Sequence, residues 1–258
     1  MITSRDWHSL QAEFSLAKPF NHIVVDNFWT PEIAQQLVAE FPAYNSDQWM
    51  FYHNALEDKK TCNQWDRFPL VTYRAFDFLM SSFFVNTMRA ATGIDDLHGD
   101  MGLHGGGWHA HSTGGKNNIH LDYDIHPKLG LQRKLNIIIY MTPDWDTNWE
   151  GGLELWTHDP VTGGPKECVK QVENKFNRAI IFDTTQNSWH GLPKELKCPT
   201  AVVRRSMAAY YLTTPPATAS DRKKALFAPY GDQANDPEVL EIIKKRANID
   251  QAAQVYRK

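Results

Sequence analysis

Apolar and polar positions change their spacing twice along the chain, which divides it into three parts. Residues 1–97 show mainly helical spacing, and we expect them to form a helical lead-in. Residues 98–213 hold short β-prone runs and predict a core of strands, whereas residues 214–258 predict a helical tail. Because all-β folds of this size are often undivided, we expect residues 1–258 to form a single domain.

The lead-in contains one predicted strand and two predicted helices. A β-branched run at residues 21–26 predicts the strand, and the Thr-Pro pair at 30–31 favours the start of the first helix. Apolar residues recur near helical spacing from 69 to 91 and predict one long amphipathic helix, with Asp66 as its candidate cap. The polar and aromatic segment 45–66 has no clear period, so no element is predicted there.

The core contains short β-prone runs separated by turns that carry Gly and Pro. Seven of these runs predict strands, at 116–122, 133–142, 152–156, 168–172, 178–183, 187–191 and 201–213. Many short strands with such turns favour an all-β barrel or sandwich. In the tail, Asp236 and Pro237 open a predicted helix, which we expect to be solvated.

Composition excludes some classes of function without selecting one. The chain has 258 residues, of which 42% are hydrophobic, as in an ordinary globular protein. Its net charge of −3 lacks the excess of basic residues that is typical of nucleic-acid-binding proteins. No apolar run reaches the roughly 18 residues of a transmembrane segment. The three cysteines lack paired spacing, as in proteins of a reducing compartment, so we expect a cytoplasmic location. The oligomeric state does not follow from the sequence.

Candidate chemistry begins at His120 and Asp122. On a strand, two residues separated by one position leave the same face, so both side chains point the same way. A further histidine, His190, follows 68 positions after Asp122 on another predicted strand. Two histidines and one carboxylate with open positions are the ligands of non-haem Fe(II) oxygenases, so these three residues are candidate metal ligands.

Predicted strand 201–213 adds an arginine to this set. A 2-oxo acid that chelates a metal through its keto oxygen and C1 carboxylate leaves its second carboxylate in need of a buried cation. Arginine suits that role because its planar fork binds a carboxylate with two hydrogen bonds. Alternation places Arg204 and Ser206 on one face and Arg205 on the other, although a bulge would exchange them. Tyr140 is a candidate for a second hydrogen bond to the same carboxylate.

These motifs together resemble the 2-oxoglutarate- and Fe(II)-dependent dioxygenases, in particular their prolyl-hydroxylase-like branch. The similarity covers about residues 19–213. The matching motifs are His120-x-Asp122, Tyr140-x-x-Pro143-Asp144-Trp145-Asp146, Gly151-Gly152, Ser188-Trp189-His190 and Arg204-x-Ser206. The resemblance implies a mainly β, jelly-roll-like and cupin-like double-stranded β-helix. Supporting helices would flank it at the N-terminal side and one helix at the C-terminal side.

The resemblance also implies a reaction and roles for single residues. His120, Asp122 and His190 would bind Fe(II), and Arg204 with Tyr140 and Ser206 would bind 2-oxoglutarate. Dioxygen would be the second co-substrate, with ascorbate as an optional reductant. The expected outcome is hydroxylation of a C–H bond with release of succinate and CO2, although desaturation or cyclisation would need no different ligands.

The sequence departs from the family in ways that affect substrate and co-substrate binding. Where related enzymes carry a tyrosine before the His-x-Asp motif, this chain has His111, which we expect to contact 2-oxoglutarate or substrate. The insert-like loop 123–134 argues against a peptidyl-proline substrate, and small molecules, sugars and peptides all remain open. Candidate substrate contacts are Trp108, Asn118, Trp156 and His126.

Two other classes of protein also fit parts of the pattern. A non-catalytic cupin-like module could bind a metal or a sugar, but it would have no need of Arg204 with Tyr140. A zinc-dependent hydrolase could use the same histidines, but it would need a general base near the metal. His109-x-His111 has no companion ligands at zinc spacing, and Asp124 is a competitor of Asp122 for the carboxylate role.

Overall fold

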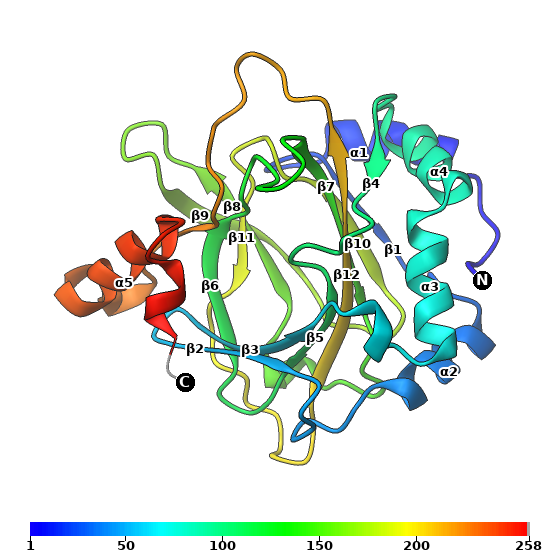
Figure 1. The fold of residues 1–258 in the computed structure, drawn as a ribbon, viewed down its shortest axis with the longest axis horizontal. Helices are drawn as coiled ribbons and strands as arrows, with labels where there is room; N and C mark the ends of the chain where they lie inside the picture. The colour runs from blue at the N-terminus through cyan, green and yellow to red at the C-terminus, as the bar shows by residue number, and fades with distance from the viewer. Residues whose placement is uncertain (257–258) are drawn as a thin grey trace.

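The computed structural model describes residues 1–256, within which thirteen strands form one antiparallel sheet (Figure 1). The strands are β1 His22–Val25, β2 Met50–His53, β3 Glu57–Cys62, β4 His98–Gly99, β5 Gly107–His111, β6 Lys116–Leu121, β7 Gln132–Tyr140, β8 Leu153–His158, β9 Pro165–Val172, β10 Ala179–Asp183, β11 Trp189–Leu192, β12 Arg204–Thr213 and β13 Leu226–Phe227. They are ordered β1-β10-β7-β12-β5-β3-β6-β11-β8-β9, with β2, β4 and β13 paired to β3, β12 and β6. The sheet curls into the predicted double-stranded β-helix, which confirms the expected fold class.

Helices cover one outer side of this sheet. They are α1 Gln11–Leu16, α2 Pro31–Glu40, α3 Leu70–Met80 and α4 Ser82–Thr92, and they lie together on the right of Figure 1. Strand β7 explains why they pack there. Ile137 and Ile139 leave one face and join the buried core with Leu37 and Phe84, whereas Asn136 and Ile138 leave the other face and line the cavity. The alternation of β7 therefore separates a helix-packing face from a site-facing one.

The predicted long helix at 69–91 is wrong, because it is broken at Ser81. That residue has extended backbone angles, and its Oγ accepts a hydrogen bond from the Phe84 amide at 3.2 Å. A serine that caps the next turn competes with continuation of the helix. Asp66 is not the cap of α3 either, since Pro69 occupies that position.

The lead-in also supplies the hairpin β2–β3, which the sequence did not predict. Its residues lack an apolar period because Lys59 and Thr61 on β3 point into a polar cavity rather than into the core. Strand β3 pairs with β2 along one edge, and along its other edge it pairs with β6 at residues 57–58 and with β5 at residues 60–62, so it bridges β5 and β6. Its polar inner face belongs to the site.

The tail folds back onto the sheet. Helix α5 (Pro237–Ala247) and the short helix η5 (Ala252–Val255) follow β13 on the left of Figure 1. The expectation of a solvated helix is wrong for the inner face of α5, where Arg246 hydrogen bonds to the buried Glu57. Tyr256, which follows η5, also donates to Glu57. Among residues 1–256, no helix combines the length and the apolar character needed to cross a membrane.

Candidate active site

His120, Asp122 and His190 come together inside the sheet. His120 on β6 and His190 on β11 are direct cross-strand partners, and Asp122 follows β6 by one residue. The carboxylate oxygens of Asp122 lie 3.8 Å from Nε2 of His120 and 4.0 Å from Nε2 of His190. One ligand atom from each of the three buried side chains lies within 4.8 Å of the others, which is the geometry needed to hold one metal ion.

Both imidazoles present a free nitrogen to this point. Nδ1 of His120 lies 2.8 Å from the Asn118 carbonyl, and Nδ1 of His190 lies 2.8 Å from the Ser188 carbonyl. Because a carbonyl only accepts, each Nδ1 carries the proton and each Nε2 keeps its lone pair. Burial lowers the pKa of His120 to about 3 and also lowers the pKa of His190. Both rings are therefore neutral, and each Nε2 can donate its lone pair to a metal ion. This donor set fits a divalent transition metal.

Arg133 keeps Asp122 ionised. Its guanidinium lies 3.4 Å from the Asp122 carboxylate and is held between two phenol rings, 3.4 Å from the centroid of Tyr123 and 3.4 Å from that of Tyr210. Burial alone would raise the pKa of Asp122, but Arg133 and the two histidines bring it below its ordinary value. One carboxylate oxygen of Asp122, Oδ2, is buried without a hydrogen-bond partner, as expected of an atom that would bind a cation.

Arg204 is a buried cation in the same cavity. It is 2% exposed, and within residues 1–256 no carboxylate lies at ion-pair distance. Its Nε donates to the Gly151 carbonyl at 2.7 Å, and its guanidinium lies 5.1 Å from the ring of Tyr140. Gly151 has φ +84°, and a Cβ there would lie 3.1 Å from Cδ of Arg204. A buried, uncompensated arginine is costly unless a ligand supplies the anion, so the site fits a carboxylate at Arg204.

Neighbours of Arg204 on the paired strands complete this end of the cavity. His111 on β5 is its direct partner, and both ring nitrogens of His111 are buried without a partner in the described chain. Ser206 lines the cavity two residues further along β12. Arg205 leaves the opposite face and lies 5.8 Å from the ring of Phe41, so the strand is regular here and Arg204 is the inward arginine.

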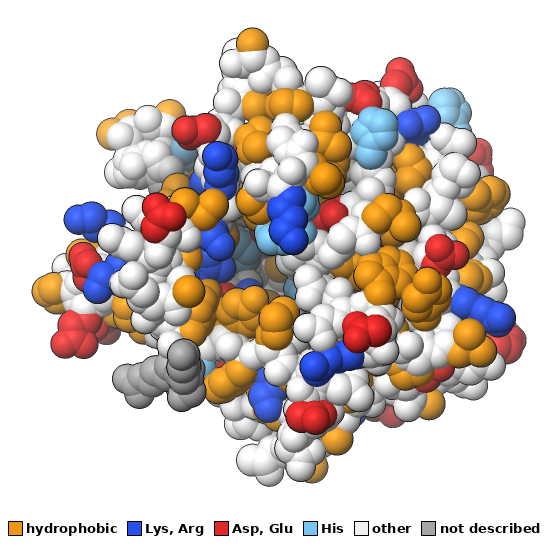
Figure 2. Space-filling view, in the orientation of Figure 1, with side chains coloured by type: hydrophobic (Ala, Val, Ile, Leu, Met, Phe, Trp, Pro, Cys, Tyr) orange, Lys and Arg blue, Asp and Glu red, His pale blue; other side chains and the backbone are white. Residues whose placement is uncertain are grey.

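The cavity that joins these groups has a volume of about 590 Å³. Figure 2 shows this face of the molecule hollowed near its centre, with basic side chains at the edge of the hollow. Of the residues predicted from the sequence, six line the cavity: His111, His120, Asp122, His190, Arg204 and Ser206. Tyr140 does not line the cavity. Its ring packs against the guanidinium of Arg204, and its hydroxyl donates to the Val172 carbonyl at 3.4 Å.

The four candidate substrate contacts do not line the cavity. Trp108 lies three positions before His111 on β5, so its side chain leaves the opposite face of the strand and packs in the core on the helix side. The amide of Asn118 is used by Ala228 and Gln233. Trp156 and His126 make other contacts: the indole donates to Glu154 at 3.0 Å, and the imidazole lies 3.7 Å from Asp100.

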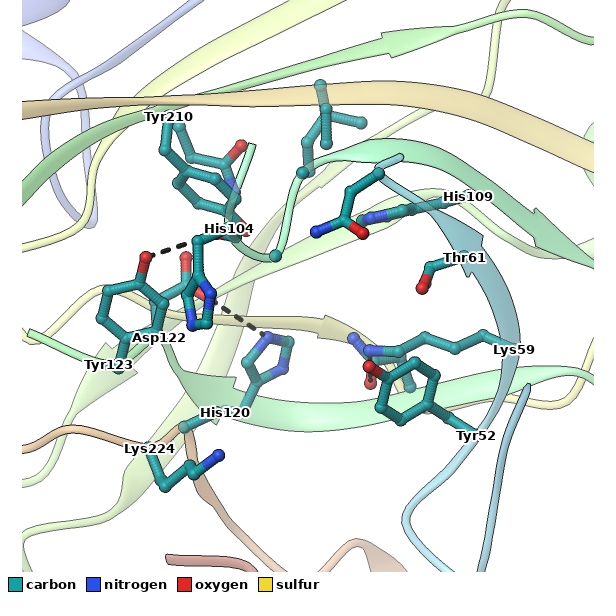
Figure 3. Close-up of a pocket in the computed structure, with 18 of the residues that line it drawn as sticks. Tyr52, Lys59, Thr61, His104, His109, His120, Asp122, Tyr123, Tyr210 and Lys224 are labelled. Atoms are coloured by element: carbon teal, nitrogen blue, oxygen red, sulfur yellow. Dashed lines mark hydrogen bonds and ion pairs between the residues drawn. The ribbon is translucent and has the colours of Figure 1, made fainter. Parts of the chain in front are cut away.

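Other residues also line the cavity. Figure 3 shows Tyr52, Lys59 and Thr61 entering from the β2–β3 hairpin and Lys224 from the segment before β13. Further residues are His104, His109, Tyr123, Arg133, Tyr210, Arg246 and Tyr256. For His109 the signal in the sequence was its spacing from His111, because residues two positions apart on a strand share a face.

Comparison with known proteins agrees with this geometry. Residues 106–212 match the family model described as the 2OG-Fe(II) oxygenase superfamily. A segment of 88 residues is 30% identical to mouse (Mus musculus) prolyl 3-hydroxylase OGFOD1, covering 33% of this chain and 16% of that protein. The chain therefore matches about one sixth of the length of this curated relative.

Solved structures show the same fold at low identity. A Pseudomonas putida prolyl-4-hydroxylase is 12% identical with a TM-score of 0.55, covering 81% of this chain and 100% of that one. A Trichoplax adhaerens prolyl hydroxylase in complex with a hypoxia inducible factor peptide fragment is 13% identical with a TM-score of 0.53, covering 82% and 94%. HygX of Streptomyces hygroscopicus, with nickel, 2-oxoglutarate and hygromycin B bound, is 9% identical with a TM-score of 0.52, covering 86% and 92%.

Residues 106–212 are therefore similar to the 2OG-Fe(II) oxygenase superfamily, and the fold is like that of the prolyl hydroxylases. This confirms the resemblance inferred from the sequence motifs. Fe(II) and 2-oxoglutarate, which define the superfamily, also fit the neutral histidine pair, the ionised Asp122 and the uncompensated Arg204.

Proposed function

We propose that this protein is an Fe(II)- and 2-oxoglutarate-dependent dioxygenase that hydroxylates a C–H bond. His120, Asp122 and His190 hold the iron, and Arg204 binds the far carboxylate of 2-oxoglutarate. The observation that carries the proposal is the pairing, in one cavity, of a three-ligand metal site with a buried arginine that lacks a carboxylate. When bound, the two groups supply dioxygen activation and C–H oxidation with release of succinate and CO2, and ascorbate would serve as a reductant.

The residues of the chain bind and orient these groups. The carbonyls of Asn118 and Ser188 fix the two imidazoles, so the iron meets ligands that are already aligned. Arg133 keeps Asp122 negative, and Gly151 fixes the guanidinium of Arg204 through its carbonyl. Ser206 and His111 lie beside Arg204 and offer a hydroxyl and an imidazole to the same co-substrate.

The two alternative classes explain less of the cavity. A zinc-dependent hydrolase, like the binding module, gives the buried Arg204 no anion to bind. A cupin-like binding module would leave Arg204 without a role. The primary substrate is either a small molecule or a peptidyl group, since the structural relatives include one complex with a peptide fragment and one with hygromycin B.

The domain organisation and the location of the protein are part of the same proposal. Strands from the lead-in, the core and the tail all join one sheet, which supports a single domain over residues 1–258, of which 257–258 lie outside the described residues. The three cysteines are free thiols, which supports a cytoplasmic location.

The metal and 2-oxoglutarate sites can be tested together by spectroscopy. Anaerobic addition of Fe(II) and 2-oxoglutarate should give a weak visible charge-transfer band. His190→Ala should abolish the band, whereas His98→Ala, at an exposed histidine outside the cavity, should keep it. Absence of the band in the intact protein would refute the proposed function.

A further inference from the structure

The cavity carries more positive charge than iron and 2-oxoglutarate require. Its lining has six Lys or Arg side chains and one acidic side chain, Asp122, although the whole chain has 27 basic and 30 acidic residues. Two of the cations are already assigned, since Arg133 faces Asp122 and Arg204 suits 2-oxoglutarate. Four others remain: Lys59, Lys223, Lys224 and Arg246.

Glu57 offsets only one of these four charges. It is fully buried, with its carboxylate 2.9 Å from Nζ of Lys59 and 3.0 Å from Nε of Arg246, and it accepts a hydrogen bond from Tyr256. Burial alone would raise the pKa of Glu57, but the two cations lower it to about 2. One carboxylate between two cations leaves one positive charge in excess and holds Lys59 and Arg246 in place.

Lys223 and Lys224 have no ion-pair partner within residues 1–256. Lys223 is exposed and Lys224 is half-buried, on the segment before β13, which pairs with the strand that carries His120. Figure 3 shows Lys224 on the same side of the cavity as His120. Burial and the nearby charge of Arg246 lower the pKa of Lys224, as expected for two cations without a carboxylate between them.

We propose that the primary substrate is a small molecule with a phosphate or carboxylate group, which binds at Lys59, Lys224 and Arg246. The inference rests on the proposed function, because it assumes that iron and 2-oxoglutarate occupy the inner part of the cavity. Cations in a half-enclosed cavity attract and orient an anion far more strongly than cations on an open surface. The volume of about 590 Å³ lies within the ordinary range for small-molecule sites.

Binding of matched compounds to the loaded protein tests the inference. Protein loaded with Zn(II) and 2-oxoglutarate is titrated in a calorimeter with glucose, glucose 6-phosphate, glucuronate and inorganic phosphate. With 2-oxoglutarate at Arg204, any added anion must use another subsite. We expect glucose 6-phosphate or glucuronate to bind at least about tenfold more tightly than glucose, as a charge-assisted contact predicts. The comparison of the two anions identifies which acidic group is preferred.

Variants locate the binding. Lys224→Gln should weaken binding of the preferred anion about tenfold, and Lys224→Arg should restore it to within about twofold. Lys223→Gln provides a second variant at an exposed position. Lys166→Gln makes the same charge change at an exposed residue of β9 outside the cavity and should leave binding unchanged.

Two results would overturn the inference. Anions that bind no more tightly than glucose would show that the surplus charge does not select the substrate. Anion binding that is equal in the intact protein and in both Lys223→Gln and Lys224→Gln would place the anion elsewhere. Titration with 2-oxoglutarate alone separates the two proposals. If 2-oxoglutarate fails to bind, both fail; if it binds and the anions do not, only the substrate inference fails.

Discussion

His120 and His190 face each other across the antiparallel pair β6–β11, and each ring donates from Nδ1 to the carbonyl two residues before it. The ring centroids lie 4.5 Å apart, with both Nε2 atoms directed at Asp122. Two strands thus fix the two candidate ligands in the same way, so the proposed metal site is organised by backbone contacts that do not depend on the ion. Such preorganisation strengthens metal binding and fixes the ligand geometry.

Arg204 should control the affinity for 2-oxoglutarate. Arg204→Met removes the buried cation that we propose binds the co-substrate, and we expect the dissociation constant of 2-oxoglutarate to rise at least about 30-fold, which is about 2 kcal/mol. Arg204→Lys keeps the charge but loses the planar fork, so its effect should be intermediate. Titration of the charge-transfer band with 2-oxoglutarate measures each constant.

The adjacent Arg205 is the matched control for this experiment. It leaves the opposite face of β12 toward Phe41, so Arg205→Met should change the 2-oxoglutarate dissociation constant by less than about twofold, as for other changes away from a site. A large effect of Arg205→Met with little effect of Arg204→Met would mean that the strand faces are assigned the wrong way round.

Arg133 should make metal binding tolerant of acid. Arg133→Met removes the cation that lowers the pKa of Asp122, so burial then raises that pKa and the carboxyl takes a proton at a higher pH. Because the metal needs the carboxylate, Zn(II) affinity should fall more at pH 6 than at pH 8. Arg133→Lys retains the charge and should show the smaller pH dependence. Equal losses at both pH values would indicate only a structural role.

Glu57 should be important for stability because it joins the tail to the sheet. Glu57→Gln leaves Lys59 and Arg246 without a counter-charge in a buried place, and we expect a loss of about 3 kcal/mol in the free energy of unfolding. Glu241→Gln breaks the exposed pair with Lys245 and should cost less than about 0.5 kcal/mol. Urea unfolding compares the two. Similar small losses would contradict a structural role for the Glu57 cluster.

His109 should make the metal-free protein sensitive to mild acid. Burial lowers its pKa to about 3, whereas the unfolded chain has an ordinary histidine pKa of roughly 6.5. As the pH falls below roughly 6.5, His109 becomes protonated in the unfolded state but stays neutral in the folded state, so the folded state loses stability. Between pH 7 and 5.5, His109→Gln should lose about 1 kcal/mol less than the intact protein. Exposed His8→Gln should match the intact protein in these unfolding measurements.

The alternation of residues along a single strand can be read from the sequence, and it correctly predicts which residues share a face of the strand. It places His120 with Asp122, Arg204 with Ser206, and Arg205 on the other side. The same rule applied to β5 would have placed Trp108 in the core, opposite to His111. Alternation is fixed by strand geometry alone, so it needs no knowledge of the neighbouring strands.

Contacts between distant segments were decided only by the tertiary structure. Asn118 shares a face with His120, yet its amide is taken up by Ala228 and Gln233 of the tail. Ser81 ends a helix whose apolar spacing continues past it.

The sequence by itself therefore predicted the candidate ligand set, the candidate arginine and the fold class, because each depends on residue type and local strand period. Only the tertiary structure set His190 opposite His120, and only it brought Lys224 and Arg246 to a cavity that also holds Lys59. Those positions depend on strand register and on how the tail docks onto Glu57, and no local pattern in the chain encodes either.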